Sequence, residues 1–258
     1  MRTGLRRFYR RTVTLIEFEI RKLLHDQTQV WVRIIQPALW LLIFGEAFTR
    51  MGTVPTGNYT YLQFMTPGVL AQSVMFVAIF YGITVVWERD LGLLNKLLST
   101  PTPRSAIVIG KALSAGIRGV VQAIAVFILA LIIGVDISLN PLHLLAVLFV
   151  VIMLGMFFAG LSMCLASLFR TRERVMGIGQ AITMPLFFAS NAIYPASVLP
   201  GWLKVLVKVN PLSYVIDAIR SLLVTNDLSR LHMDLTVIVF ATATMIFLTS
   251  LSFKKIIS

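Results

Sequence analysis

The sequence predicts an all-α integral membrane protein with six transmembrane helices. Of its 258 residues, 57% are hydrophobic and only 13% are charged, which is about half the charged share of an ordinary soluble domain. Several apolar runs reach the ~20 residues that a helix needs to cross ~30 Å of hydrocarbon. Because these runs show no strand-type alternation, we expect helices rather than a barrel.

The predicted spans follow one another along a single transmembrane domain, residues 1–258. They are expected at Val30–Phe48, Thr66–Val86, Ala106–Val135, Pro141–Phe169, Val175–Ile193 and Asp234–Phe253. A basic amphipathic segment, residues 5–24, precedes the first span. Its apolar side chains fall on one helical face and its arginines on the other. We therefore expect a helix at the inner membrane surface, with the arginines toward lipid headgroups.

Lysine and arginine residues orient these spans. With the N-terminus in the cytoplasm, 18 of the 23 lie in inner segments and five in outer segments. The positive-inside rule therefore predicts a multi-pass protein of the cell membrane with both termini cytoplasmic. Topology accounts for the net charge of +12, so no nucleic-acid partner is expected.

A charged segment interrupts the apolar pattern after the second span. It reads "WERDLGLLNKLLSTPTPRS", residues 87–105, and a helical projection separates its leucines from most of its charged residues. Two prolines end this pattern, which predicts a short cytoplasmic helix over Glu88–Leu98. A helix this short needs its apolar face covered. The cover is either lipid and the inner ends of the bundle, or a groove on a cytoplasmic partner.

A second unusual segment, residues 194–227, follows the fifth span on the outer side. It is too rich in Pro, Lys and Asn for a span and too apolar for a free loop. It predicts a re-entrant pair of helices within residues 201–224, namely Gly201–Val209 and Pro211–Val224. Asn210 is the expected N-cap of the second helix, with Pro211 at its first position. The alternative is an interfacial hairpin that only closes the outer mouth.

These two segments carry a family resemblance. Residues 88–113, "ERDLGLLNKLLSTPTPRSAIVIGKAL", resemble the first cytoplasmic loop of the type-2 ABC-transporter permeases, which include membrane subunits of daunorubicin-type drug exporters and Nod-factor or glycan exporters. Residues 210–223, "NPLSYVIDAIRSLL", resemble the late signature of that family. The resemblance covers essentially the whole chain. The matching signature positions are Asn210, Pro211, Tyr214, Asp217 and Arg220.

The resemblance implies two six-helix subunits around a pathway and two cytoplasmic ATPase subunits. The helix of the first inner loop would be the coupling helix that docks on the ATPase. Its candidate docking residues are Glu88, Arg89, Leu91, Leu94, Asn95, Lys96 and Leu98. The second and fifth spans commonly face the pathway, and their polar candidates are Gln72, Ser73, Tyr81, Thr84, Gln180, Thr183 and Asn191. These side chains could instead only hydrogen-bond neighbouring helices.

No enzyme motif is visible in the sequence. Gly110-Lys111 lacks the other positions of a phosphate-binding loop, so ATP and Mg²⁺ are expected in a separate ATPase and no cofactor in this chain. The three histidines lie far apart and predict no metal site. We expect an exporter subunit for an amphipathic drug, glycolipid or lipid-linked glycan, as a homodimer or a heterodimer with a similar permease. The alternatives are a secondary transporter or channel and, less favoured, an intramembrane lipid-processing enzyme.

Overall fold

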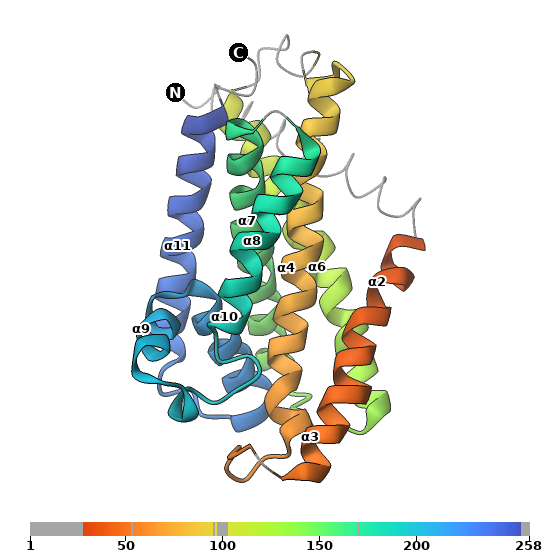
Figure 1. The fold of residues 1–258 in the computed structure, drawn as a ribbon, viewed down its shortest axis with the longest axis vertical. Helices are drawn as coiled ribbons and strands as arrows, with labels where there is room; N and C mark the ends of the chain where they lie inside the picture. Colours follow the sequence, from red (N-terminus) through yellow and green to blue (C-terminus); the bar gives the residue numbers. More distant parts are fainter. Residues whose placement is uncertain (1–27, 53, 95, 97–102, 170, 254–258) are drawn as a thin grey trace.

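The fold was analysed in a computed structural model that describes residues 28–52, 54–94, 96, 103–169 and 171–253. The predicted helix over residues 5–24 lies outside these ranges. All regular secondary structure in the described residues is helical, and long helices run side by side along one axis (Figure 1). The all-α prediction is therefore confirmed.

The helices alternate in direction between the two ends of the bundle (Figure 1). In chain order they are α2 (Thr28–Leu39), the π-helical η1 (Trp40–Gly45), α3 (Glu46–Met51), α4 (Tyr61–Asp90), α6 (Arg104–Ile133), α7 (Pro141–Leu168), α8 (Arg172–Phe188), the 3₁₀ turn η2 (Ala196–Val198), α9 (Gly201–Val209), α10 (Pro211–Arg220), the π-helical η3 (Ser221–Thr225) and α11 (Leu231–Ser252). The two helices predicted within residues 201–224 are present as α9 and as α10 with η3, and their outer, re-entrant placement stays a prediction.

Five helical stretches of the described residues are long and apolar enough to cross a membrane. They are Val32–Met51, Tyr61–Asp90, Arg104–Ile133, Pro141–Leu168 and Leu231–Ser252, and they correspond to the first four predicted spans and the sixth. The predicted fifth span, Val175–Ile193, is not among them. Its helix, α8, has 17 residues, which span about 26 Å, and charged residues occupy its first turn.

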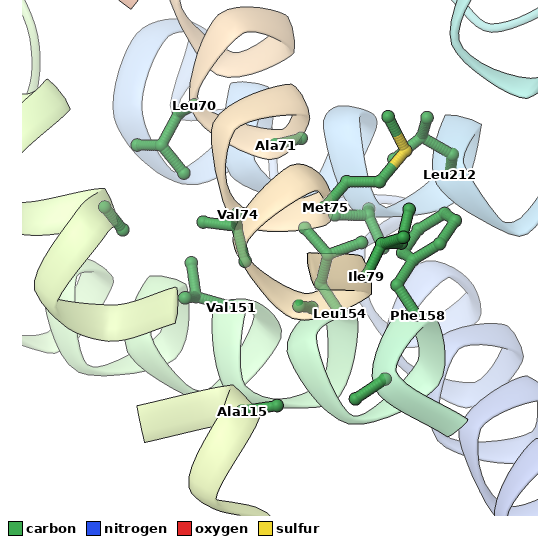
Figure 2. Packing of buried hydrophobic residues seen from close by; sticks show 14 of the residues in the cluster. Leu70, Ala71, Val74, Met75, Ile79, Ala115, Val151, Leu154, Phe158 and Leu212 are labelled. Carbon is green, nitrogen blue, oxygen red and sulfur yellow. The ribbon is translucent and has the colours of Figure 1, made fainter. Parts of the chain in front are cut away.

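The long helix α4 forms the centre of the bundle. Most of its side chains are buried, whereas only a minority of those in α2 and α11 are buried. Figure 2 shows Val74 of α4 facing Val151 of α7, and Met75 of α4 beside Leu212 of α10. α4 can therefore pass a displacement at either end to several neighbours.

Small residues let α6 and α7 approach closely. A Cβ added to Gly155 would lie 2.7 Å from the Cα atom of Gly116, which leaves no room for any side chain. Close contact of this kind stabilises helix pairs in lipid, where burying apolar surface brings no hydrophobic gain.

Hydroxyl groups add hydrogen bonds between other helix pairs. Ser162 of α7 donates to the carbonyl of Ile79 over 2.9 Å, and Thr249 of α11 donates to the carbonyl of Gly160 over 2.9 Å. Both bonds are buried. They fix α4 and α11 against opposite sides of α7.

Candidate functional site

The first part of the candidate site is the bundle end that carries the α4–α6 connection, the predicted inner end. α4 continues to Asp90, so Glu88 belongs to the last turn of a span. Gly92 then takes a left-handed conformation with φ of +71°, which glycine adopts far more easily than other residues. The helix resumes at Leu93. The prediction of one continuous helix over Glu88–Leu98 is therefore wrong. The helical projection of this segment treated Gly92 as an ordinary helix position, whereas the helix is broken there.

An ion pair joins α4 to α6 at the base of this connection. Nζ of Lys111 lies 2.7 Å from Oε2 and 2.8 Å from Oε1 of Glu88. The two side chains keep only 5% and 14% of their surface exposed. The Lys111 ammonium also lies 5.8 Å from the ring centroid of Tyr81. Glu88, which the sequence assigned to a docking surface, is instead engaged within this chain.

A second set of contacts joins the same connection to α8. Nη2 of Arg172 lies 3.4 Å from Oδ2 of Asp90, and its guanidinium lies 5.1 Å from the ring centroid of Trp87. Arg89 also pairs with Asp90, over 3.3 Å. Exposed pairs of this kind stabilise little on their own. Their position matters more, because they link the α4–α6 connection to the start of α8. Lys96, farther along the α4–α6 connection, is exposed.

The leucines of the connection divide into two groups. Leu91 and Leu93 have 71% and 46% of their surface exposed. Leu94 is completely buried and belongs to the hydrophobic core, so its assignment to a partner-facing surface is corrected. Asn95 and Leu98 lie outside the described residues. Among the described leucines of the connection, the exposed ones are therefore the two on either side of the glycine break.

The polar candidates of the second span do not share one face of α4. Gln72 and Ser73 line a cavity of about 160 Å³ between α2 and α4. Tyr81 faces α6, where its ring centroid lies 4.7 Å from the guanidinium carbon of Arg118. Thr84 donates a hydrogen bond to the carbonyl of Tyr81 within its own helix. Of the four candidates, Gln72 and Ser73 line this cavity between α2 and α4.

The candidates of the fifth span are also dispersed. Gln180 is exposed, Thr183 is buried, and Asn191 follows the end of α8. In the described part of the chain, none of the three lines the cavity between α2 and α4. The expectation that α4 and α8 present one polar surface remains a prediction for an assembly of two chains.

The signature of residues 210–223, which the sequence predicts to lie on the outer side, organises the opposite end of the bundle. The side chain of Asn210 accepts a hydrogen bond from the backbone N–H of Leu212, and Pro211 occupies the first position of α10, as predicted. The same Asn210 amide donates to the carbonyls of Leu186 and Ala189, over 2.6 and 3.1 Å. This residue therefore both starts α10 and attaches it to the end of α8.

Arg220 and Asp217 complete that attachment. Nη1 of Arg220 lies 3.0 Å from Oδ1 of Asp217, which also accepts a hydrogen bond from the Asn191 amide. Nη2 donates to the carbonyls of Asn191 and Phe64, over 2.7 and 3.3 Å. Burial lowers the pKa of Arg220 to about 10, against the opposing effect of Asp217, so the guanidinium stays charged at neutral pH. One cation thus joins α4, α8 and α10.

A larger cavity, of about 780 Å³, lies beside this cluster. Tyr214, Asp217 and Arg220 line it from α10, and Asp234 lines it from α11. The Tyr214 hydroxyl donates to the carbonyl of Lys208 over 2.6 Å, which fixes α10 against α9. Within the described ranges, no group of three or more His, Cys, Asp or Glu side chains could hold a metal ion.

Sequence reasoning missed the Glu88–Lys111 pair. The available signal was a pair of opposite charges at the inner ends of two consecutive spans, where an unpaired charge would be costly. It also missed that Arg33 lines the same cavity as Gln72, which depends on how α2 packs against α4.

The chain matches the profile of the ABC-2 type transporter family over residues 10–224. The match covers the inner connection, α8 and the outer signature. The chain belongs to the ABC-2 type transporter family. It is 30% identical over 192 residues to the ycf38 protein of Cyanophora paradoxa, an alignment that covers 73% of this chain and 66% of that protein.

Two further relatives carry more informative names. The daunorubicin resistance ABC transporter permease protein DrrB1 of Streptomyces coeruleorubidus is 27% identical over 199 residues, covering 77% of this chain and 70% of the relative. Nodulation protein J of Rhizobium meliloti is 24% identical over 198 residues, covering 76% and 74%. The alignments thus span about two thirds to three quarters of each relative. The ABC-2 family is one of transporters, which agrees with the apolar helical bundle and with a permease rather than an enzyme.

Proposed function

We propose that this chain is the membrane subunit of an ATP-driven exporter in the cell membrane. Two copies would form the pathway as a homodimer, with both termini cytoplasmic. Two cytoplasmic ABC ATPase subunits would bind and hydrolyse ATP with Mg²⁺, since this chain carries no phosphate-binding loop in its sequence. The observation that carries the proposal is an ABC-2 family bundle whose inner connection exposes two apolar side chains, Leu91 and Leu93.

The contacts of the inner connection support a mechanical role. A partner that presses on Leu91 and Leu93 acts next to Asp90, which Arg172 links to α8. The Glu88–Lys111 pair links the same turn to α6. Movement of the ATPase would therefore reach three helices through short, charged contacts, and α4 would carry it along the bundle to the outer cluster around Arg220.

The cargo in this proposal is amphipathic: a drug, a glycolipid or a lipid-linked glycan. The relatives' names refer to daunorubicin resistance in one case and to nodulation in another, so they favour no single one of these. Small amphipathic molecules suit the scattered amides and hydroxyls of the apolar helices. Export is favoured because the drug-resistance relative would have to remove its drug from the cell.

The docking surface can be tested with Leu91→Glu and Leu93→Glu together. The double variant should still insert into the membrane, but at least about tenfold less ABC ATPase should co-purify with it from its own cells, because two central apolar contacts are replaced by charges. The recovered ATPase is identified by mass spectrometry through its phosphate-binding loop, and ATP hydrolysis by the purified complex is measured in parallel.

Leu139→Glu is the matched control, because Leu139 is an exposed leucine of the α6–α7 connection, which lies at the opposite end of α6 from the α4–α6 connection. It should leave both ATPase recovery and hydrolysis unchanged. Equal recovery of the ATPase with the double variant and with the unchanged chain would remove Leu91 and Leu93 from the proposed interface.

A further inference from the structure

The large cavity beside Arg220 is the starting point of a separate inference. It holds about 780 Å³, and pockets that enclose a drug-sized ligand hold roughly 300–1,000 Å³. Its wall is formed mainly by α10, η3 and the start of α11. The cavity is therefore large enough for a small organic molecule, and the lining indicates the chemistry of that molecule.

Three residues of the lining each carry a buried polar atom that makes no hydrogen bond in the described part of the chain. The atoms are Oγ of Ser213, Oδ1 of Asn191 and Nε of Arg220. Ser213 and Asn191 keep only 3% and 6% of their surface exposed. Because a buried polar group without a partner is costly, these atoms point to a bound group that would satisfy them.

The three atoms need different partners. The N–H at Nε of Arg220 is a donor and Oδ1 of Asn191 is an acceptor, whereas the Ser213 hydroxyl can act as either. An ammonium group would satisfy the acceptor but not the arginine, and a phosphate or carboxylate anion would satisfy the arginine but not the amide oxygen. A hydroxyl group both donates and accepts, so a ligand with several hydroxyls satisfies all three.

The charges of the lining also favour a neutral ligand. Three cations and three carboxylates belong to the described lining, so their formal charges cancel. The cations are Lys208, Arg220 and Arg230, and the carboxylates are those of Asp217, Asp227 and Asp234.

Apolar side chains form a small part of the described lining. They are Ala196, Val207 and Met233, whereas pockets for drug-like molecules are lined predominantly by hydrophobic and aromatic side chains. Tyr214 adds one aromatic ring, and its hydroxyl already donates to the carbonyl of Lys208. The lining therefore fits a polar headgroup better than the apolar body of a drug.

We propose that this cavity binds a neutral polyhydroxylated group, the sugar headgroup of an amphiphile. Sugar hydroxyls accept from Nε of Arg220, donate to Oδ1 of Asn191 and exchange hydrogen bonds with Ser213. Asp234, which is 5% exposed and lines the cavity from α11, accepts from a further hydroxyl.

The inference rests on the proposed function in one respect, that the sugar belongs to the cargo. It then favours a glycolipid or lipid-linked glycan over a drug. Binding itself is measured on the purified chain without an ATPase. Loss of sugar binding and loss of ATPase association are therefore separate results.

The test is native mass spectrometry of the purified full-length chain in tetraethylene glycol monooctyl ether, a detergent without a sugar. Dodecyl maltoside and dodecyl phosphocholine are titrated separately, because they share an alkyl chain and differ in headgroup. The maltoside should bind at least about fivefold more tightly. Dodecyl lactoside supplies a second sugar, and no preference for either glycoside over dodecyl phosphocholine would overturn the proposal.

Maltose separates two sources of the sugar, since it has the headgroup of dodecyl maltoside without the chain. It should bind more weakly than the maltoside. Equally tight binding of maltose would overturn the assignment to an amphiphile and would make a free sugar the ligand.

Ser213→Ala and Asp234→Asn locate the binding. Ser213→Ala should weaken dodecyl maltoside binding about fivefold, the net value of one hydrogen bond. It should not lower the melting temperature, since Oγ of Ser213 has no partner in the described chain. Asp234→Asn should weaken binding about tenfold, because hydrogen bonds to charged groups are stronger. Neither variant should change the binding of dodecyl phosphocholine.

Ser250→Ala is the matched control. Ser250 lies in the last turn of α11, and its hydroxyl donates to the carbonyl of Ile246. It follows Asp234 by 16 residues, which corresponds to about 24 Å along the helix. This variant should change dodecyl maltoside binding less than twofold. Equal losses for Ser213→Ala and Ser250→Ala, or no loss in either cavity variant at an unchanged melting temperature, would overturn the proposed site.

Discussion

Two charged side chains, Glu88 and Lys111, explain how the bundle tolerates polar groups near the end that carries the α4–α6 connection. Glu88 and Lys111 satisfy each other in surroundings that would penalise either charge alone. Such a pair adds little net stability compared with apolar residues, but removal of one partner leaves an uncompensated charge. The energetic cost of a substitution here therefore depends on whether the other partner is still present.

This asymmetry gives a prediction for Lys111→Met. The single variant should lower the free energy of unfolding by about 3 kcal/mol or more, because Glu88 remains buried without a cation. Lys111→Met combined with Glu88→Gln should recover most of that loss. Thermal unfolding of the purified variants in detergent measures both. Additive losses in the double variant would show that the two side chains act independently.

At the scale of elements, two Asn-Pro-Leu sequences start helices in this chain. Asn140 caps α7 and Asn210 caps α10, and each accepts a hydrogen bond from the backbone N–H two residues later, over 3.0 Å. Only Asn210 also donates to carbonyls of another helix, at Leu186 and Ala189. The same three-residue pattern is thus a cap in one place and a connection between helices in the other.

This difference can be measured with Asn140→Ala and Asn210→Ala. The first substitution should cost about 1 kcal/mol, the usual value of an N-cap. The second should cost about 2–4 kcal/mol, because two partly buried carbonyls also lose their donor. Thermal unfolding of the two variants supplies the comparison, with Asn140→Ala as the matched control. Equal costs would mean that the bonds from Asn210 to α8 contribute nothing to stability.

The elements that the sequence predicted well are those with a strong local signal. The start of α10 was predictable because Asn210 and Pro211 are local capping residues, and α9 because its bounds are set by flanking proline and asparagine. The burial of Leu94 was not predictable. A helical projection shows which side chains share a face, but whether that face meets the same chain, lipid or a partner depends on tertiary packing. The break at Gly92 was missed for a related reason, since one glycine within a helical pattern is often tolerated.

At the scale of the whole molecule, the bundle has chemically different ends. The α4–α6 connection and the start of α8 carry clustered basic residues, whereas α9, α10 and the large cavity with its mixed charges occupy the other end (Figure 1). The orientation inferred from the positive residues determines which end of the bundle faces the cytoplasm, and therefore which role each end is proposed to have. It puts Leu91 where a nucleotide-hydrolysing partner could reach it, and the signature around Arg220 at the outer mouth.

The orientation is therefore the prediction on which the others depend, and single cysteines can test it. The native Cys164 is first replaced by serine, a small change because its contact to the Ser252 hydroxyl is long, at 3.8 Å. Leu91→Cys and Leu139→Cys are then introduced separately, since both positions are exposed and lie in the connections at the two ends of α6. A membrane-impermeant maleimide added to intact cells should label the cysteine at 139 and should reach the one at 91 only after the membrane is opened. Labelling of position 91 in intact cells would invert the bundle, and the leucine pair could then no longer contact a cytoplasmic ATPase.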